Sequence, residues 1–182
     1  MRRYSEGDFS VGAQLEKAQG DNLTFRAGIE TFLIGASLGD FSLNGQMELK
    51  YPIFGKEASI GAFADMSATE SPFFYASHHS TYAWWDKEFK KEFRTHFGGY
   101  IDLEMTGTRF QLDVENVANY VYLKNEGGTY TTNDATPVIQ PSYSITAQQH
   151  NGSIQILSAT LQQNFKLGPL HWDNNVTYQL SG

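Results

Sequence analysis

The chain has 182 residues, enough for one domain with a sizeable buried surface, and a formal net charge of −7. Its 13 Lys and Arg against 20 Asp and Glu argue against a nucleic-acid-binding protein, which needs a basic face to meet phosphates. The absence of cysteine excludes disulfides and thiolate metal sites. No run of residues approaches the ~20 apolar positions that a membrane-spanning helix requires.

Aromatic side chains make up 14% of the residues and glycines number 17, whereas there are only 5 prolines. The mean hydropathy is nevertheless negative, at −0.42. Two classes of protein combine these properties. One is a soluble all-β protein, and the other is a membrane β-barrel, in which apolar residues are hidden from hydropathy plots because they alternate with polar ones.

Strict alternation of apolar and polar residues recurs in the first half of the chain. It is clearest over residues 41–51, where the odd positions are apolar or glycine and the even positions are polar. Weaker versions predict strands over about 8–19, 23–36 and 57–66. Alternation of this kind is typical of strands with one apolar and one wet face.

The second half alternates in the same way over longer segments. It predicts strands over about 89–105, 109–123, 150–167 and 170–180. No segment has convincing helical periodicity, so the sequence predicts an all-β chain of about eight strands.

The connections between these strands differ in length in a regular way. Only two are long, at 67–88 and 124–149, and both are even-numbered connections, so an up-and-down order places them at the same end. Short turns at one end and long loops at the other are typical of outer-membrane barrels, whose long loops are extracellular. We therefore expect residues 1–182 to form a single section of an antiparallel, up-and-down transmembrane β-barrel.

Aromatic residues at the ends of the predicted apolar faces favour the membrane interpretation. Tyr and Trp prefer the interface between water and lipid, where barrels carry aromatic girdles. The expected interfacial aromatics are Phe41, Tyr51, Tyr120, Tyr122, Trp172 and Tyr178. The fifth and sixth strands are also longer than the ~9–11 residues that cross the hydrocarbon layer.

Charged residues gather on the polar face of the hairpin built from the fifth and sixth strands. By alternation, one face receives Lys90, Glu92, Arg94, His96, Asp102, Glu104, Arg109, Asp113 and Glu115. One hypothesis is that this band lines a lumen and biases which ions or solutes pass. The other is that the charges lie there because lipid excludes them from the opposite face. The two hypotheses are compatible.

The remaining candidates for chemistry are weak. His78, His79 and Asp86 could suggest a metal site, but adjacent side chains on an extended backbone point apart, and His171 with Asp173 supplies too few ligands. The long-loop aromatics either pack the loop onto the rim, which we favour, or form a sugar-stacking platform: Phe73, Phe74, Tyr75, Tyr82, Trp84 and Trp85. No nucleophile elbow or phosphate loop is present, so we expect neither an enzyme nor a cofactor.

Three segments of the second half resemble a known family. They are FKKEFRTHFGGYIDLE (89–104), LDVENVANYVYL (112–123) and QHNGSIQILSATLQQNFKLGPLHWDNNVTYQ (149–179). Together they resemble the putative porin family of Bacteroidetes outer membranes. The resemblance implies a large outer-membrane β-barrel, of which this chain is an incomplete section without an export signal or a closing strand. It supports a channel but names no solute.

We therefore expect an outer-membrane channel for passive diffusion, with membrane lipid and small hydrophilic solutes as partners, no nucleic-acid partner, and the oligomeric state open. Two alternatives stay open. VENVANYVY (114–122) resembles late strands of TonB-dependent receptors, which carry an amino-terminal plug. The second alternative is a soluble β-sandwich that binds carbohydrate through its loop aromatics. Such a protein would stay monodisperse in solution without detergent, whereas a membrane barrel would not.

Overall fold

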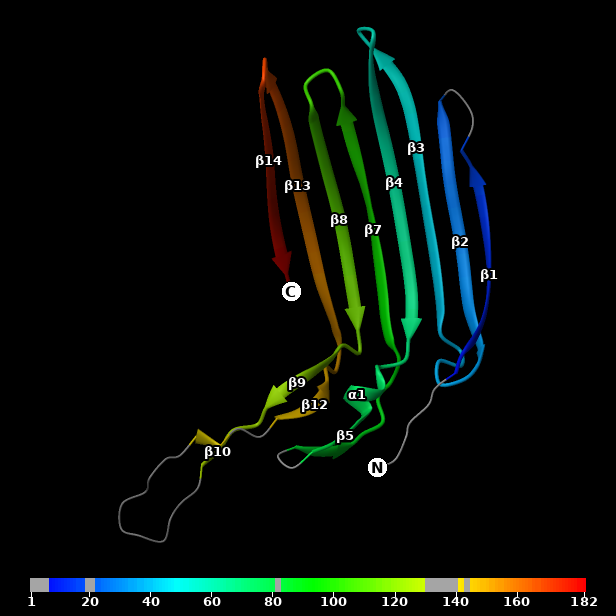
Figure 1. Ribbon diagram of the computed structural model, residues 1–182, viewed down its shortest axis with the longest axis vertical. Helices are drawn as coiled ribbons and strands as arrows, with labels where there is room; N and C mark the ends of the chain where they lie inside the picture. Colours follow the sequence, from blue (N-terminus) through cyan, green and yellow to red (C-terminus); the bar gives the residue numbers. More distant parts are fainter. Residues whose placement is uncertain (1–6, 19–21, 81–82, 130–140, 143–144) are drawn as a thin grey trace.

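The computed structural model describes residues 7–18, 22–80, 83–129, 141–142 and 145–182. Its eight long strands form one antiparallel sheet in the order β1-β2-β3-β4-β7-β8-β13-β14 (Figure 1). Their bounds are β1 (Phe9–Lys17), β2 (Leu23–Ile34), β3 (Phe41–Ile53), β4 (Lys56–Thr69), β7 (Glu92–Leu103), β8 (Thr108–Ala118), β13 (Ser153–Leu167) and β14 (Leu170–Ser181). The predicted all-β, up-and-down architecture of about eight strands is confirmed.

The short elements all lie in the two long connections. The β4–β7 connection contains α1 (Phe73–Ala76), β5 (Ser77–His79) and β6 (Trp84–Asp86). The β8–β13 connection contains β9 (Val121–Asn125), β10 (Gly128–Thr129), β11 (Pro141–Ser142) and β12 (Ile145–Gln149). Figure 1 shows both connections at the same end of the sheet, with the β3–β4, β7–β8 and β13–β14 hairpin turns at the other. Within the described residues, no helix is long and apolar enough to cross a membrane.

The strand register aligns apolar residues with apolar residues across the sheet. One row runs from Leu49 through its neighbours Ile60, Ile101 and Phe110 to Leu161, one residue from each of five strands. Because successive side chains point to opposite faces, this register gathers one continuous apolar face and one polar face. A one-residue shift in the register of any strand would move its apolar side chains to the polar face and its polar side chains to the apolar face.

The apolar face is exposed along its length. Phe97 is 54% exposed, Leu112 48% and Val176 62%. In the described part of the chain the eight long strands form one sheet, and no second layer buries these side chains. A soluble sandwich packs such a face against a second sheet as its core, whereas the eight long strands of the described residues form a single sheet.

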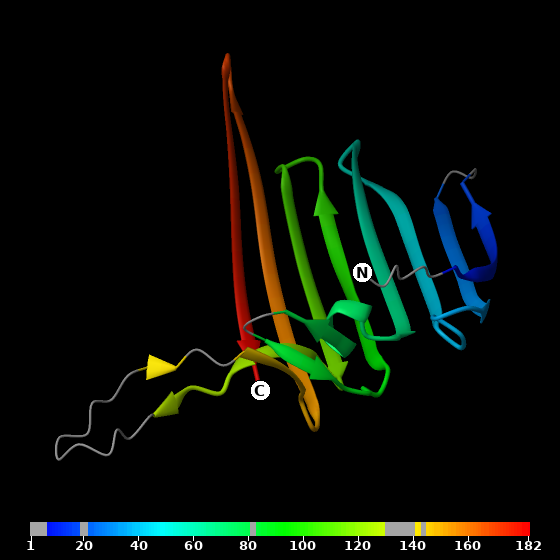
Figure 2. The ribbon, with the colours of Figure 1, turned by 60° about the horizontal axis from the view of Figure 1, so that its bottom comes forward.

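The sheet does not close on itself. Its edge strands, β1 and β14, lie at opposite ends of the strand order, and Figure 2 shows them well apart on the two sides of the sheet. The arrangement is that of an incomplete section of a barrel, as the sequence predicts.

Several strand boundaries differ from those expected. The segment expected as one strand over 109–123 divides at Asn119, whose φ of 61° turns the chain out of the sheet. Asn is one of the few residues that adopt this left-handed conformation readily. β4 continues to Thr69 rather than ending near residue 66, whereas β7 begins only at Glu92.

Most of the buried apolar side chains lie outside the centre of the sheet. Trp85, Val121 and Ala147 are 6%, 6% and 0% exposed, and all three belong to the long connections. We call residues 70–80, 83–91, 119–129 and 145–152 the loop-side cluster. Figure 1 shows α1, β5, β9 and β12 grouped below the lower ends of β7, β8 and β13.

Candidate functional site

The structure places seven of the nine predicted band residues on strands β7 and β8 and on one face of the sheet. These seven are Glu92, Arg94, His96, Asp102, Arg109, Asp113 and Glu115. Lys90 precedes β7 and lies in the loop-side cluster, and Glu104 lies in the turn after β7. The seven residues on the strands therefore share one face, as alternation predicts, whereas Lys90 and Glu104 lie beyond the strand ends. That the band lines a lumen stays a prediction.

The band residues pair with one another across strands. Arg94 lies 2.6 Å from Glu92 on its own strand and 3.5 Å from Glu115 on β8. His96 has one ring nitrogen 3.4 Å from Asp113 and the other 3.8 Å from Asp65 on β4. Of the basic band residues, Arg94, His96 and Arg109 each lie within 4 Å of at least one carboxylate.

A second cluster, which the sequence reasoning missed, centres on Tyr100. The Tyr100 hydroxyl donates to Glu48 of β3 at 2.5 Å, and it reaches across β4 to do so. This crossing requires Gly61, because a Cβ there would overlap the Tyr100 ring. The Arg109 guanidinium lies 3.9 Å from the ring centroid, a cation–π contact. The sequence does contain a hint of this cluster: Tyr100 occupies an even-numbered position of β7, as do the band residues of that strand, so alternation places it on the same face.

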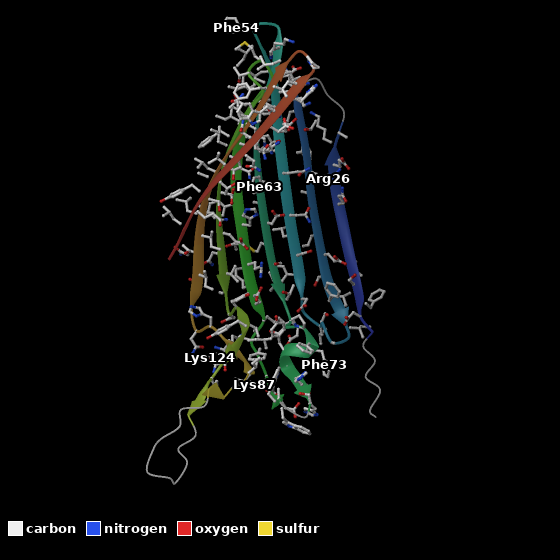
Figure 3. All side chains as sticks on the ribbon, turned by 60° about the vertical axis from the view of Figure 1, so that its left-hand side comes forward. Arg26, Phe54, Phe63, Phe73, Lys87 and Lys124 are labelled. Atoms are coloured by element: carbon white, nitrogen blue, oxygen red, sulfur yellow. The ribbon has the colours of Figure 1, made fainter. Side chains whose placement is uncertain are left out.

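An open hollow of about 600 Å³ lies on the polar face beside this cluster. Glu16, Arg26, Gln46, Phe63 and Tyr100 contribute to its lining. Arg26, Gln46 and Phe63 occupy one row of the sheet, and Figure 3 shows Arg26 and Phe63 in its middle part. The hollow therefore sits over the strands and away from the loop-side cluster.

A half-buried ion pair joins three parts of the chain at the loop end of the sheet. Asp40, which is 5% exposed, accepts the Lys91 ammonium at 2.6 Å, and both of its carboxylate oxygens accept the backbone N–H of Glu70. Lys91 also donates to the Leu38 carbonyl at 2.6 Å. The β2–β3 turn, the end of β4 and the start of β7 are thus held together. The sequence reasoning missed this pair as well.

The two long connections are also bonded to each other. The Gln149 amide donates to the carbonyls of Lys90 at 2.7 Å and Asn119 at 2.8 Å. The Asn119 amide donates to the Lys91 carbonyl at 3.1 Å, and Lys87 donates to the Ala147 carbonyl at 2.6 Å. These side-chain-to-backbone bonds make the loop-side cluster one structure instead of two separate loops.

The loop aromatics divide into buried and exposed members. Trp85 is buried, donates to the Tyr75 carbonyl at 2.9 Å and stacks on His78 at 4.7 Å. Trp84 is 71% exposed and stacks on His79 with the rings 3.8 Å apart. The predicted packing role fits Trp85, whereas Trp84 faces solvent. Tyr82 lies outside the described residues.

The two neighbouring histidines of this loop have different partners. His78 stacks on Trp85 while His79 bonds Asp86 at 2.9 Å, so the two imidazoles point apart, as expected. No group of three or more potential ligands was found among the described residues. Hydrogen bonds from the Ser77 hydroxyl and then from the His79 ring hold the pKa of Asp86 below its ordinary value. His171 and Asp173 lie on one face of β14.

The predicted interfacial aromatics occupy different environments. Phe41 begins β3, and its ring centroid lies 6.5 Å from that of Phe93. Tyr51 lies near the other end of the same strand. Trp172 and Tyr178 lie near the two ends of β14, exposed by 59% and 64%. Tyr120 and Tyr122 were expected to end a sheet strand. They lie instead beyond the break at Asn119, with their rings stacked 6.4 Å apart.

Comparison with known proteins gives one match. A family model described as "Putative porin" matches residues 1–182, the whole chain. No curated protein and no solved structure matches it. The match agrees with the resemblance that the second half of the sequence suggested, and it extends that resemblance to the first half. An open, all-antiparallel sheet with one exposed apolar face and one charged face is the architecture that a porin wall requires. The chain belongs to the putative porin family.

Proposed function

We propose that this chain forms part of the wall of an outer-membrane channel through which small hydrophilic solutes diffuse passively. Its apolar face contacts lipid, and its polar face lines a water-filled lumen. The long connections then lie on the extracellular side and the short turns on the periplasmic side. No catalytic step is part of the proposal.

The observation that carries this proposal is the contrast between the two faces of one sheet. The apolar face leaves large side chains such as Phe97 and Leu161 exposed by 54% and 43%. In water this would be an extensive apolar patch, whereas monomeric soluble proteins rarely expose more than a few hundred Å² in one patch. In lipid it is the expected outer surface of a barrel. The polar face carries cross-strand ion pairs, which suit a hydrated wall.

The charged band gives the channel an expected ionic preference. The seven band residues on β7 and β8 include four carboxylates and two permanently cationic side chains, so their balance is negative. A negatively charged wall attracts cations and repels anions over about a Debye length, ~8 Å at physiological salt. We therefore expect a mild preference for cations.

Reversal potentials across a salt gradient in planar bilayers test this proposal on the protein at its full natural length. Arg94→Ala with Arg109→Ala removes two positive charges from the band, and we expect the cation preference to increase. Lys17→Ala with Lys124→Ala changes the net charge equally but lies off the band: Lys17 ends β1 and Lys124 lies on β9. This control should shift the potential less. Absence of any conductance would contradict the channel, and equal shifts for the two pairs would contradict the role of the band.

A further inference from the structure

Two aromatic rings stand at the centre of the polar face, among positions that otherwise carry charges, amides and hydroxyls. Phe63 on β4 pairs with Gly98 on β7. In the next pair of residues on the polar face, Gly61 of β4 pairs with Tyr100 of β7. A Cβ on Gly98 would lie 2.8 Å from the Phe63 ring, and one on Gly61 would overlap Tyr100. Each ring therefore covers the glycine opposite it. The two reciprocal pairs give the hollow an aromatic floor.

Among the described residues, four of the six charged side chains that line the hollow contact a neighbouring side chain closely; Lys17 and Asp65 are the exceptions. Arg26 lies 2.8 Å from Glu16. Arg109 covers the Tyr100 ring and lies 3.9 Å from Asp102, while Glu48 accepts the Tyr100 hydroxyl. An ionic ligand would have to compete with these contacts, so the hollow does not favour a strongly charged solute.

Three other polar side chains of the hollow, two amides and one carboxylate, are available to bond a ligand. Within the described part of the chain, the side-chain amides of Asn44 and Gln46 make no hydrogen bond, and both line the hollow. Asp65 also lines it; its side chain is 53% exposed, and its pairing with His96 is long, at 3.8 Å. Each amide offers donors and an acceptor, and the carboxylate is a strong acceptor.

We propose that this hollow is a binding site for a neutral saccharide in the channel wall. The apolar C–H face of a sugar ring stacks on Phe63, and its hydroxyls bond Asn44, Gln46 and Asp65. The volume of about 600 Å³ falls within the range of small-molecule sites. The inference rests on the proposed function, since it takes the polar face to be the lumen wall, and it adds the class of solute.

Calorimetric titration of the full-length protein in detergent micelles tests this site without requiring conduction. The probes are maltotriose and xylotriose, with polyethylene glycol of matched mass and glutarate as non-saccharide comparisons. At least one trisaccharide should bind more tightly than either comparison. Phe63→Ala should weaken that binding about five- to tenfold, in line with the energy of ring contacts.

Two matched variants separate ring loss from general damage. Phe97→Ala removes the same side chain from the apolar face of β7, where Phe97 is 54% exposed, and should leave saccharide binding unchanged. Phe63→Tyr keeps the ring and should bind within about twofold of the wild type. If Phe63→Ala does not fold, Gln46→Ala, an exposed position, supplies the loss-of-binding test, with about a threefold effect expected.

Failure of both trisaccharides to bind, tighter binding of glutarate, or equal affinity in Phe63→Ala and Phe97→Ala would each overturn the saccharide site. Bilayer conductance measured on the same preparation separates this outcome from failure of the proposed function. Conductance without saccharide binding overturns the site alone. Saccharide binding without conductance overturns the channel and leaves a sugar-binding wall.

Discussion

The sheet and the loop-side cluster are stabilised in opposite ways. In the sheet, neighbouring strands bond along their whole length, while large side chains such as Leu112 stay 48% exposed on the apolar face. In the loop-side cluster, strands are only a few residues long, but Trp85 and Ala147 are buried at 6% and 0% exposure. The sheet therefore depends on whatever covers its apolar face, and the cluster depends on its own packing.

A lysine placed on each face of the same strand tests whether the apolar face is covered by lipid. Leu112→Lys puts an ammonium on the apolar face of β8, and in a bilayer we expect it to lower the free energy of unfolding by about 2–4 kcal/mol if the site lies near the midplane. Gln111→Lys on the polar face should cost less than about 1 kcal/mol. Denaturant titration of the protein folded into lipid vesicles measures both. Equal costs would contradict the assignment of the two faces.

The cluster can be tested through its two neighbouring tryptophans. Trp85→Ala removes a buried ring that donates to the Tyr75 carbonyl, and we expect the local free energy of opening to fall by about 3 kcal/mol, the lower end for Trp→Ala changes. Trp84→Ala removes a ring that is 71% exposed and should have a much smaller effect. Amide hydrogen exchange at residues 73–79 and 84–87 reports the opening.

The sheet should keep its exchange protection in both tryptophan variants, because its strand hydrogen bonds do not pass through the cluster. Loss of protection throughout β4 and β7 in Trp85→Ala would show that the sheet and the cluster unfold together. The contrast drawn between them would then be wrong.

The smallest expected effect is a pH dependence of the β5–β6 hairpin. Hydrogen bonds from Ser77 and then His79 hold the pKa of Asp86 below its ordinary value. Their contribution is therefore complete above the ordinary carboxyl pKa, and it is lost as the pH falls through the lowered one. Hydrogen exchange of residues 77–79, compared over acidic pH, should show weakening protection in the wild type and a flatter profile in Asp86→Asn. Identical profiles would contradict this role of Asp86.

The strands and their faces were predictable because alternation is a local property. In residues 41–51 apolar and polar side chains alternate strictly, so the sequence alone assigns each residue to a face. The observed strand, β3, differs only by continuing to Ile53. The break at Asn119 was not predictable in the same way. The alternation continues through Tyr120 and Tyr122, yet a single residue with a φ of 61° redirects both side chains out of the sheet. The residues that hold this turn, Lys91 and Gln149, are distant in sequence.

Local patterns in the sequence specify which side chains share a face, where the hairpin turns lie and which end receives the long connections, because a strand repeats every two residues regardless of its neighbours. Which residues meet across strands depends on how the whole sheet is assembled. The Tyr100 contact with Glu48 over Gly61 and the burial of Asp40 against Lys91 both depend on register and on turns elsewhere in the chain. A hydrogen bond between distant strands leaves no local pattern, so the charged wall could be predicted and its aromatic floor could not.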